Sequence, residues 1–262
     1  MMKHLELALT MALASSVAAS IQPVAATQEV DATLHWARRV ELGMLVSGVV
    51  QEVTAGNGEH VLAGQALVIL DARDFEARLA GAMAHLAGVL PALEEAREEL
   101  VRAEDLYDRT LLSEHDLELS RVAVAKLKAE RAHADARVAR ATLRLERGTL
   151  RAPFAGIVVA RSVEAGQAIV SRCESRTLMV LAGDENLIAR VALDAQSLAG
   201  LRIGQELAVL AGDLTLTGKI AAIAAEPLAD LDDGPRYLVE VLVPRPANGG
   251  LLVGQGVRLK LP

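Results

Sequence analysis

Apolar residues recur at alternating four- and three-residue steps from about Asp74 to Arg147. The first run has nine apolar positions: Phe75, Leu79, Ala82, Leu86, Val89, Leu93, Ala96, Leu100 and Ala103. The second run contains two polar lapses: Leu117, Ser120, Val124, Leu127, Arg131, Ala134, Val138, Ala141 and Leu145. Such a pattern is the seam of a heptad repeat, and it predicts two helices of roughly thirty residues, each about 45–50 Å long.

The segments on either side of this helical insert have a β pattern and resemble each other. Val46-Ser47-Gly48-Val49-Val50 recurs as Phe154-Ala155-Gly156-Ile157-Val158, and a further glycine follows ten residues after the first one in each copy, at Gly58 and Gly166. β-branched runs broken by glycine-containing turns are typical of hairpins. We therefore predict two copies of one β unit, which pair to bury their apolar faces.

The pairing of the two β units decides the path of the insert between them. Because their inner ends then lie close together, the insert must leave and return as an antiparallel hairpin. The turn is expected at Tyr107 to Leu112, where the seam lapses, with Ser113 as the N-cap of the second helix and Asp116 as its near capping-box partner. An interior proline costs about 3 kcal/mol, so Pro91 predicts a kink near Gly88 to Pro91.

Downstream of Leu181 the pattern changes to short strands punctuated by glycine and proline. Strands are expected at 187–193, 206–210, 214–222, 237–243 and 256–261. A small antiparallel barrel accommodates them, and the stretch 34–42 is expected to add a strand from the N-terminal side. Gly204-Gln205 and Gly254-Gln255 each precede one of these strands. Upstream, Ala-Gly-Gln-Ala occurs twice, which indicates recurrent turn chemistry at 63–66 and 165–168.

The N-terminal residues have the pattern of an export signal. Lys3 precedes an apolar stretch from Leu7 to Ala14, and small residues lead to a cleavage site near Ala19 or Ala26. The apolar run is shorter than the ~20 residues that a spanning helix needs, so a permanent anchor is the weaker interpretation. No cysteine lies near the cleavage region, which excludes a lipoprotein anchor.

The expected fold class is α+β in an elongated chain of several modules. A lipoyl-like β-sandwich is split by an antiparallel coiled-coil hairpin and followed by a small antiparallel β-barrel. The expected divisions are a signal peptide at 1–26, an N-terminal strand joining the barrel at 27–41, the two sandwich halves at 42–73 and 148–182, the α-hairpin at 74–147, and the barrel at 183–262.

Composition and charge exclude several function classes. Aromatic residues make up only 2% of the 262 residues, and 27 basic against 34 acidic residues give a net charge of −7. Both features argue against a nucleic-acid partner. The single cysteine, Cys173, permits no intramolecular disulfide and no cysteine-based zinc site. The six histidines have no paired spacing, so no metal site is expected.

No motif predicts catalysis. The chain has no GxSxG elbow, no phosphate-binding loop and no dinucleotide fingerprint. His115 lies beside two acidic residues near Ser113, but sequence neighbours at a helix start point in different directions, so a solvated tip is the preferred interpretation. The β units resemble lipoyl or biotinyl carrier domains, yet neither contains a lysine, and Asn57-Gly58 occupies the exposed turn. We therefore expect neither an enzyme nor a cofactor.

The order of modules resembles the periplasmic adaptor, or membrane-fusion, proteins of tripartite efflux pumps. The likeness covers about residues 34 to 262, and its most specific local element is the string from Arg151 to Gly156. Adaptors of the resistance-nodulation-division (RND) type carry an Arg-x3-Leu-x6-Ser pattern at the hairpin tip that meets the outer-membrane channel. Arg102, Leu106 and Ser113 have this spacing. Each residue also has a purely structural explanation: Arg102 as a solvated charge, Leu106 as an apolar contact and Ser113 as an N-cap.

The resemblance implies a non-catalytic protein of the periplasm, associated with the inner membrane. Such adaptors form a ring, commonly a hexamer, between an inner-membrane RND transporter and an outer-membrane channel protein. Arg102 would hydrogen-bond carbonyls of the channel, with Leu106 packing beneath it. Longer family members continue beyond the barrel into a membrane-proximal domain, so the transporter contact has the least support. Two alternatives stay open: an adaptor of an ATP-driven exporter or type I secretion system, and a coiled-coil binding protein outside transport.

Overall fold

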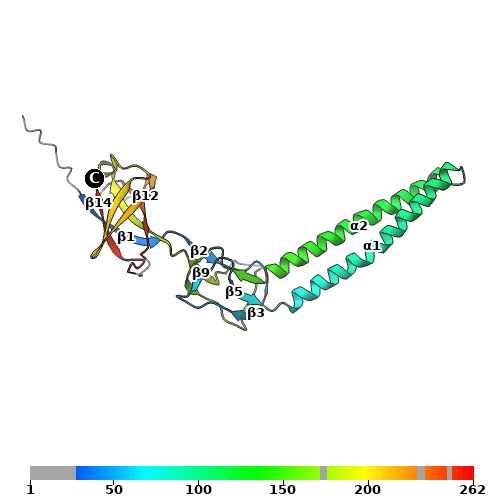
Figure 1. Ribbon diagram of the computed structural model, residues 1–262, viewed down its shortest axis with the longest axis horizontal. Helices are drawn as coiled ribbons and strands as arrows, with labels where there is room; N and C mark the ends of the chain where they lie inside the picture. Colours follow the sequence, from blue (N-terminus) through cyan, green and yellow to red (C-terminus); the bar gives the residue numbers. More distant parts are fainter. Residues whose placement is uncertain (1–27, 172–175, 229–233, 247–249) are drawn as a thin grey trace, which may run out of the picture.

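The molecule is an elongated row of three bodies, a β-barrel, a β-sandwich and a helical hairpin (Figure 1). The computed structural model describes residues 28–171, 176–228, 234–246 and 250–262. The predicted α+β fold class, with its split sandwich, hairpin and barrel, is confirmed. The predicted export signal and Cys173 lie outside the described residues.

The sandwich contains two four-stranded sheets, and both β units contribute strands to each. The first sheet has the order β2 (Arg39–Leu42), β9 (Met179–Ala182), β7 (Gly156–Arg161) and β4 (His60–Val61). The second has the order β6 (Thr149–Arg151), β5 (Ala66–Leu70), β3 (Gly48–Val53) and β8 (Ala168–Ile169). One apolar core lies between them and includes Val50 and Val158 at equivalent positions of the two units.

The two β units make reciprocal hydrogen bonds. The Gly58 N–H donates to the Val158 carbonyl at 2.8 Å, and the equivalent Gly166 N–H donates to the Val50 carbonyl, also at 2.8 Å. The β3–β8 and β4–β7 pairings correspond in the same way. These contacts confirm that the sequence repeat marks two copies of one unit that fold together.

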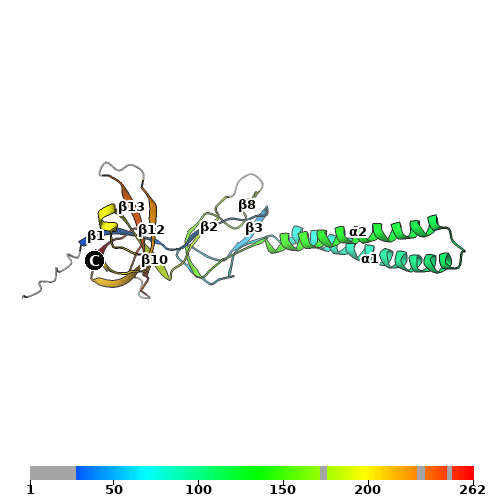
Figure 2. The ribbon, with the colours of Figure 1, turned by 90° about the horizontal axis from the view of Figure 1, so that it is seen from above.

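The helical insert doubles back as predicted. Helix α1 (Arg73–Asp108) and helix α2 (Glu114–Glu146) run antiparallel from the sandwich to the tip (Figures 1 and 2). The Leu70 N–H donates to the Gly148 carbonyl at 2.9 Å, so the chain enters and leaves the hairpin at neighbouring points. Helix α1 continues through the exposed Pro91, and Figure 1 shows it bending about midway along its length.

The burial pattern follows the predicted heptad seam. All nine seam positions of the first run are buried or half-buried, and so are all positions of the second run except Arg131. Arg131 instead points to solvent and pairs with Asp135 at 3.5 Å. The seam thus packs the helices against each other, and one of the two polar lapses is accommodated by turning outward.

Six strands close the barrel in the order β1, β10, β13, β12, β11, β14. The five strands expected downstream of Leu181 are all present, and a single-turn helix α3 (Ala195–Leu198) follows the first of them. The barrel strands are β1 (Gln28–Trp36), β10 (Asn186–Asp194), β11 (Glu206–Ala211), β12 (Leu214–Pro227), β13 (Arg236–Pro244) and β14 (Gly256–Leu261).

The expectation that the whole stretch 34–42 joins the barrel is wrong in its second half. Strand β1 ends at Trp36, and residues 39–42 form β2, which pairs with β9 in the sandwich. Leu34 is buried in the barrel core and Leu42 in the sandwich core. The apolar alternation continues through both strands, so the sequence pattern gives no sign that the chain crosses from one body to the other.

The recurrent turn chemistry is confirmed at both predicted places, and the structure shows the same turn at two further Gly-Gln pairs. In each turn a glycine has a positive φ, between 78° and 89°, and the following glutamine accepts a hydrogen bond on its Oε1 from the backbone N–H three residues before it, at 2.9–3.2 Å. Glycine tolerates this left-handed conformation without a steric cost. The four pairs are Gly64-Gln65, Gly166-Gln167, Gly204-Gln205 and Gly254-Gln255.

Candidate functional site

The hairpin turn, which carries the predicted docking site, closes the first helix in a Schellman motif. The Leu111 N–H donates to the Leu106 carbonyl at 2.9 Å, and the Thr110 N–H donates to the Tyr107 carbonyl at 2.8 Å. Thr110 adopts a φ of 60°, a position that glycine usually occupies in this motif. The predicted turn is therefore confirmed, and a β-branched residue holds its left-handed position.

Ser113 begins the second helix as predicted. Its backbone is extended, and its Oγ accepts a hydrogen bond from the Asp116 N–H at 3.2 Å. The same hydroxyl donates to the Asp116 Oδ2 at 2.6 Å. Glu114 and Asp116 place negative charge at the helix N-terminus, where the helix dipole favours it. The capping role of Ser113 is confirmed, and the residue remains exposed.

Arg102 and Leu106 follow each other by one turn of α1 just before the tip. The Arg102 side chain is 61% exposed and pairs with Glu99, with its Nη2 at 2.9 Å from Oε2. Leu106 is 39% exposed. Among the described residues, no hydrogen bond or ion pair joins Arg102 to Ser113. The structure therefore brings the three predicted residues to one end of the hairpin without a direct polar link between them.

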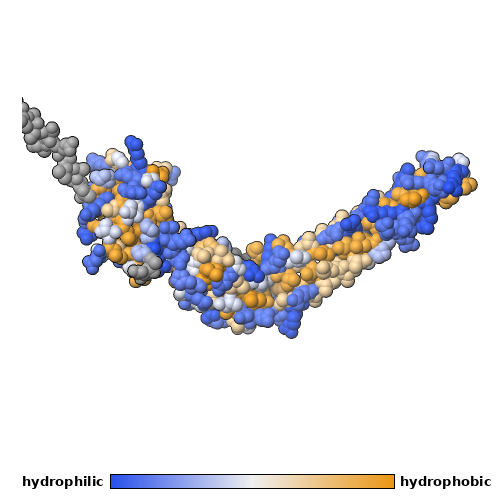
Figure 3. All heavy atoms as spheres, in the orientation of Figure 1, coloured by the Kyte–Doolittle hydropathy of each residue, from blue (hydrophilic) through white to orange (hydrophobic). Residues whose placement is uncertain are grey.

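The tip can offer a partner both hydrogen-bond donors and apolar surface. An exposed ion pair such as that of Arg102 with Glu99 contributes about 0–1 kcal/mol, so the guanidinium can exchange that partner at little cost. Leu111, at 71% exposure, and Tyr107, at 39%, extend the apolar surface that Leu106 begins. Figure 3 shows that this tip is otherwise largely hydrophilic. The sequence pattern predicts a turn at Tyr107 to Leu112 but does not show that these two side chains are exposed there.

Elsewhere, no group of histidine, cysteine, aspartate and glutamate residues within the described ranges has the arrangement of a metal site. The helices of these ranges include none that combines the length and the apolar character needed to cross a bilayer.

Comparisons with known proteins agree with this architecture. The family model of the CzcB-like barrel-sandwich hybrid domain matches residues 38–180. The nickel-cobalt-cadmium resistance protein NccB of Alcaligenes xylosoxydans xylosoxydans is 26% identical over 219 residues, which cover 82% of this chain and 52% of NccB. The multidrug resistance protein MdtA of Pectobacterium carotovorum is 29% identical over 139 residues, which cover 53% of this chain and 34% of MdtA.

The chain thus spans about half the length, or less, of these curated relatives. Among solved structures, the membrane fusion protein Spr0693 from Streptococcus pneumoniae R6 has the same fold, with a TM-score of 0.72 at 20% identity. That likeness covers 90% of this chain and 98% of Spr0693. Because the family model accounts for more than half of the chain, and the relatives and the fold point the same way, the protein belongs to the periplasmic adaptor, or membrane-fusion protein, family with a CzcB-like barrel-sandwich hybrid domain.

Proposed function

We propose that this protein is the periplasmic adaptor subunit of a tripartite efflux pump and bridges an inner-membrane transporter of the RND type and an outer-membrane channel. The observation that carries the proposal is the hairpin tip, where Arg102, Leu106 and Ser113 are exposed at the spacing typical of channel-docking adaptors. The tip lies at the far end of the molecule from the barrel (Figure 1).

The dimensions of the hairpin suit a bridging role. At 1.5 Å per residue, the 36 residues of α1 extend about 54 Å. The buried seam joins α1 to α2 along most of this length, which gives the rod a stiffness that a loop lacks. The partner contact would thus be made far from the sandwich, with Arg102 donating to channel carbonyls and Leu106 and Leu111 packing against apolar groups.

The proposed role requires no catalysis, and it includes association of several copies into a ring, expected as a hexamer, near the inner membrane. The names of the relatives point to different cargo, since NccB is a resistance protein for nickel, cobalt and cadmium and MdtA one for multiple drugs. For this reason the proposal is confined to the bridging role and assigns no exported substrate.

Charge reversal at the tip tests the proposed docking. In cells that carry the complete pump, Arg102→Glu is expected to reduce crosslinking of the tip to the channel roughly tenfold or more. The reason is that an arginine which becomes buried in a protein–protein interface often contributes a large share of the binding free energy. Susceptibility to exported compounds should rise in parallel. Arg97→Glu is the matched control, because Arg97 also pairs with an acidic residue three positions earlier, Glu94 at 3.3 Å, but lies on another side of α1.

Unchanged crosslinking and efflux in a stably folded Arg102→Glu protein would contradict the docking role. An equal loss in Arg97→Glu would show that charge anywhere on the hairpin matters and would contradict a specific contact. The RND assignment is checked separately by crosslinking from the barrel, and recovery of an ATP-driven transporter in place of an RND transporter would refute it.

A further inference from the structure

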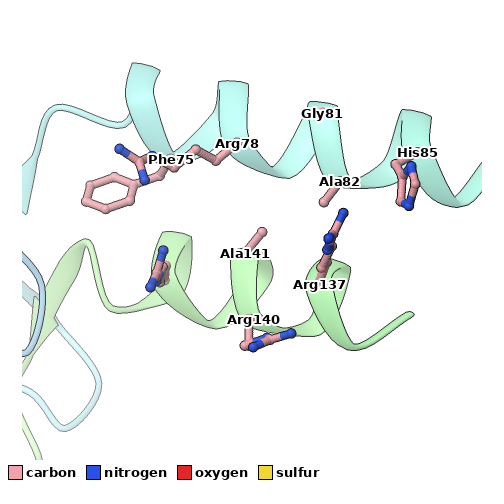
Figure 4. A pocket seen from close by; sticks show the side chains of 9 residues that line it. Phe75, Arg78, Gly81, Ala82, His85, Arg137, Arg140 and Ala141 are labelled. Atoms are coloured by element: carbon pink, nitrogen blue, oxygen red, sulfur yellow. The ribbon is translucent and has the colours of Figure 1, made fainter. Parts of the chain in front are cut away.

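An open groove lies between α1 and α2 at the sandwich end of the hairpin, the end opposite to the tip (Figure 4). Its volume is about 470 Å³. The seam has small side chains here, since Gly81 and Ala82 face Ala141 across the gap, and these leave space between the helices. The groove is lined by Phe75, Arg78, Gly81, Ala82, His85, Arg137, Arg140, Ala141 and Arg144.

Positive charge dominates this lining. Figure 4 shows Arg137 of α2 pointing across the gap, with His85 of α1 beside it, while Arg78 turns back toward the Phe75 ring. The Arg140 side chain points away from the gap in this view. Arg144, one turn further along α2, also lines the groove. A second hollow continues past His85 and Arg137 to Lys126 and His133, and Glu130 is its one acidic lining residue.

The arginines of α2 in this region differ from two others of the same helix, Arg121 and Arg131, in having no carboxylate partner within the described residues. Arg121 and Arg131 of the same helix pair with Glu118 and Asp135. Within the described residues, by contrast, neither Arg137 nor Arg144 has a carboxylate partner, and Arg140 donates only to the Ala136 carbonyl, at 3.1 Å. On the α1 side Arg78 is neutralised by Asp74, at 2.9 Å.

Arg137, Arg140 and Arg144 thus gather positive charge within two turns of α2, in a chain whose net charge is −7. Like charges three or four residues apart destabilise a helix, and neighbouring carboxylates would normally neutralise them. Arginine presents a planar set of donors that matches the oxygens of phosphate in pairs, and a phosphate group brings up to two negative charges with three acceptor oxygens. An anion bound between Arg137 and Arg144 would supply the negative charge that no carboxylate of the described residues provides there.

We propose that the groove binds a phosphate-bearing ligand, held by Arg137 and Arg144 of α2 with His85 of α1 beside them. The buried Phe75 and the methyl groups of Ala82 and Ala141 form an apolar floor, so the ligand is expected to be a phosphate ester with an apolar part. This site is separate from the tip and does not depend on the proposed bridging function.

Binding of phenyl phosphate and inorganic pyrophosphate to the purified full chain, measured by titration calorimetry, tests the proposal. We expect saturable binding of both compounds. The double variant Arg137→Gln with Arg144→Gln should weaken it roughly tenfold or more, because it removes both charged hydrogen-bond donors to the phosphate. Lysine at the same two positions should restore part of the affinity, since it keeps the charge but not the paired donors.

The matched control is Arg121→Gln with Arg131→Gln, which removes the same charge from the same helix outside the groove. Equal weakening in this control, or an absence of saturable binding to the wild-type chain at low ionic strength, would overturn the proposal. Circular dichroism establishes that each variant keeps its helices.

Vesicles distinguish the source of the phosphate. Binding to phosphatidylcholine vesicles that contain phosphatidic acid, lost in the Arg137 and Arg144 double variant, would identify a lipid headgroup as the ligand. Binding of soluble phenyl phosphate without vesicle binding would identify a free phosphate ester. The Arg102→Glu protein should bind phenyl phosphate normally, so failure of the docking role and failure of this site give different results.

Discussion

At the scale of residues, the segment from Arg151 to Gly156 makes the contacts that join the second β unit to the first. The Arg151 Nη1 donates to the Gly64 carbonyl at 3.0 Å. Ala152 is buried, donates from its N–H to the Gln65 carbonyl at 2.9 Å, and accepts on its carbonyl from the Gly64 N–H at 2.7 Å. The string therefore fastens the second β unit onto the turn of the first as soon as the chain leaves the hairpin.

The next residues of the string lie at the junction with the barrel. The Arg38 guanidinium lies 3.7 Å from the centre of the Phe154 ring, a cation–π contact between the segment that leaves the barrel and the sandwich core. The Arg38 carbonyl also accepts from the Gly183 N–H at 2.9 Å. Both chain segments that connect the two bodies are thus held at one place.

Gly156 is the residue of this string least able to accept a side chain. A Cβ there would lie 2.1 Å from the Ala182 carbonyl oxygen, in the centre of the first sheet. We expect Gly156→Ala to destabilise the fold by about 3 kcal/mol or more, measured by chemical denaturation. Gly88→Ala is the control, since its Cβ would meet open space on α1 and should stabilise the helix by about 1 kcal/mol. A Gly156→Ala chain as stable as the wild type would contradict the expected steric clash with Ala182.

The residue scale also shows where prediction from sequence succeeds and where it ends. The cap at Ser113 was predicted from its own chemical signature and is confirmed, whereas the docking role of Arg102, Leu106 and Ser113 rests on their spacing and stays a prediction. The exposure of Leu111 was not predicted, because a Schellman motif is normally recognised by its glycine and here Thr110 takes that position. The groove at Arg137 and Arg144 was not predicted, because the heptad pattern identifies apolar positions only. It does not show which charged side chains have an oppositely charged partner.

At the scale of elements, packing along the seam stabilises the hairpin more than helix propensity does. The helices carry a proline, two internal glycines and many charged residues, yet their contacts with the rest of the protein are confined to the base. At that base the Arg73 side chain donates to both Asp71 carboxylate oxygens and lowers the pKa of Asp71 to about 2. This exposed pair joins the first residue of α1 to the residue that follows strand β5.

A pair of leucines on α1 separates seam packing from general hydrophobicity. Leu93 is 2% exposed within the seam, whereas Leu90 is 43% exposed. Leu93→Ala is expected to lower the free energy of unfolding by about 3 kcal/mol, because it leaves a cavity between the helices. Leu90→Ala should change it by about 0.5 kcal/mol or less. Denaturation followed by circular dichroism measures both, and similar losses in the two variants would rule out the seam as the source of stability.

Helices and strands were predicted accurately from the sequence wherever the predicted segment lies entirely within the hairpin or the barrel. The heptad spacing predicted both helices, and alternation between turn signals predicted the five downstream barrel strands. It was less accurate for the stretch 34–42, because alternation reports that a strand has one buried face and does not report which core buries it. The partner is chosen by the register with β10 or β9, which lie far along the chain.

At the scale of the whole molecule, the hairpin is an insertion into a body that has its own core. Among the described residues, Phe75 and Leu145 are the only two of these helices that join the sandwich core. The Leu70–Gly148 hydrogen bond joins the end of β5 to the residue before β6, the two strands between which the hairpin is inserted. We expect a chain in which a short glycine-rich turn replaces residues 73–147 to retain the sandwich and the barrel. Circular dichroism should show loss of helix alone, with a dispersed amide NMR spectrum. A collapsed spectrum would contradict the independence of the sandwich.

The anchoring of Phe75 and Leu145 in the sandwich makes the hairpin a lever arm. Over a length of about 54 Å, a rotation of about 5° at its root swings the far end by about 5 Å, which is more than the reach of a hydrogen bond. The position of the hairpin tip is therefore determined by a few contacts where the helices meet the sandwich. A substitution at Phe75 or Leu145 can displace the tip from its binding site on a partner, although neither residue contacts that partner.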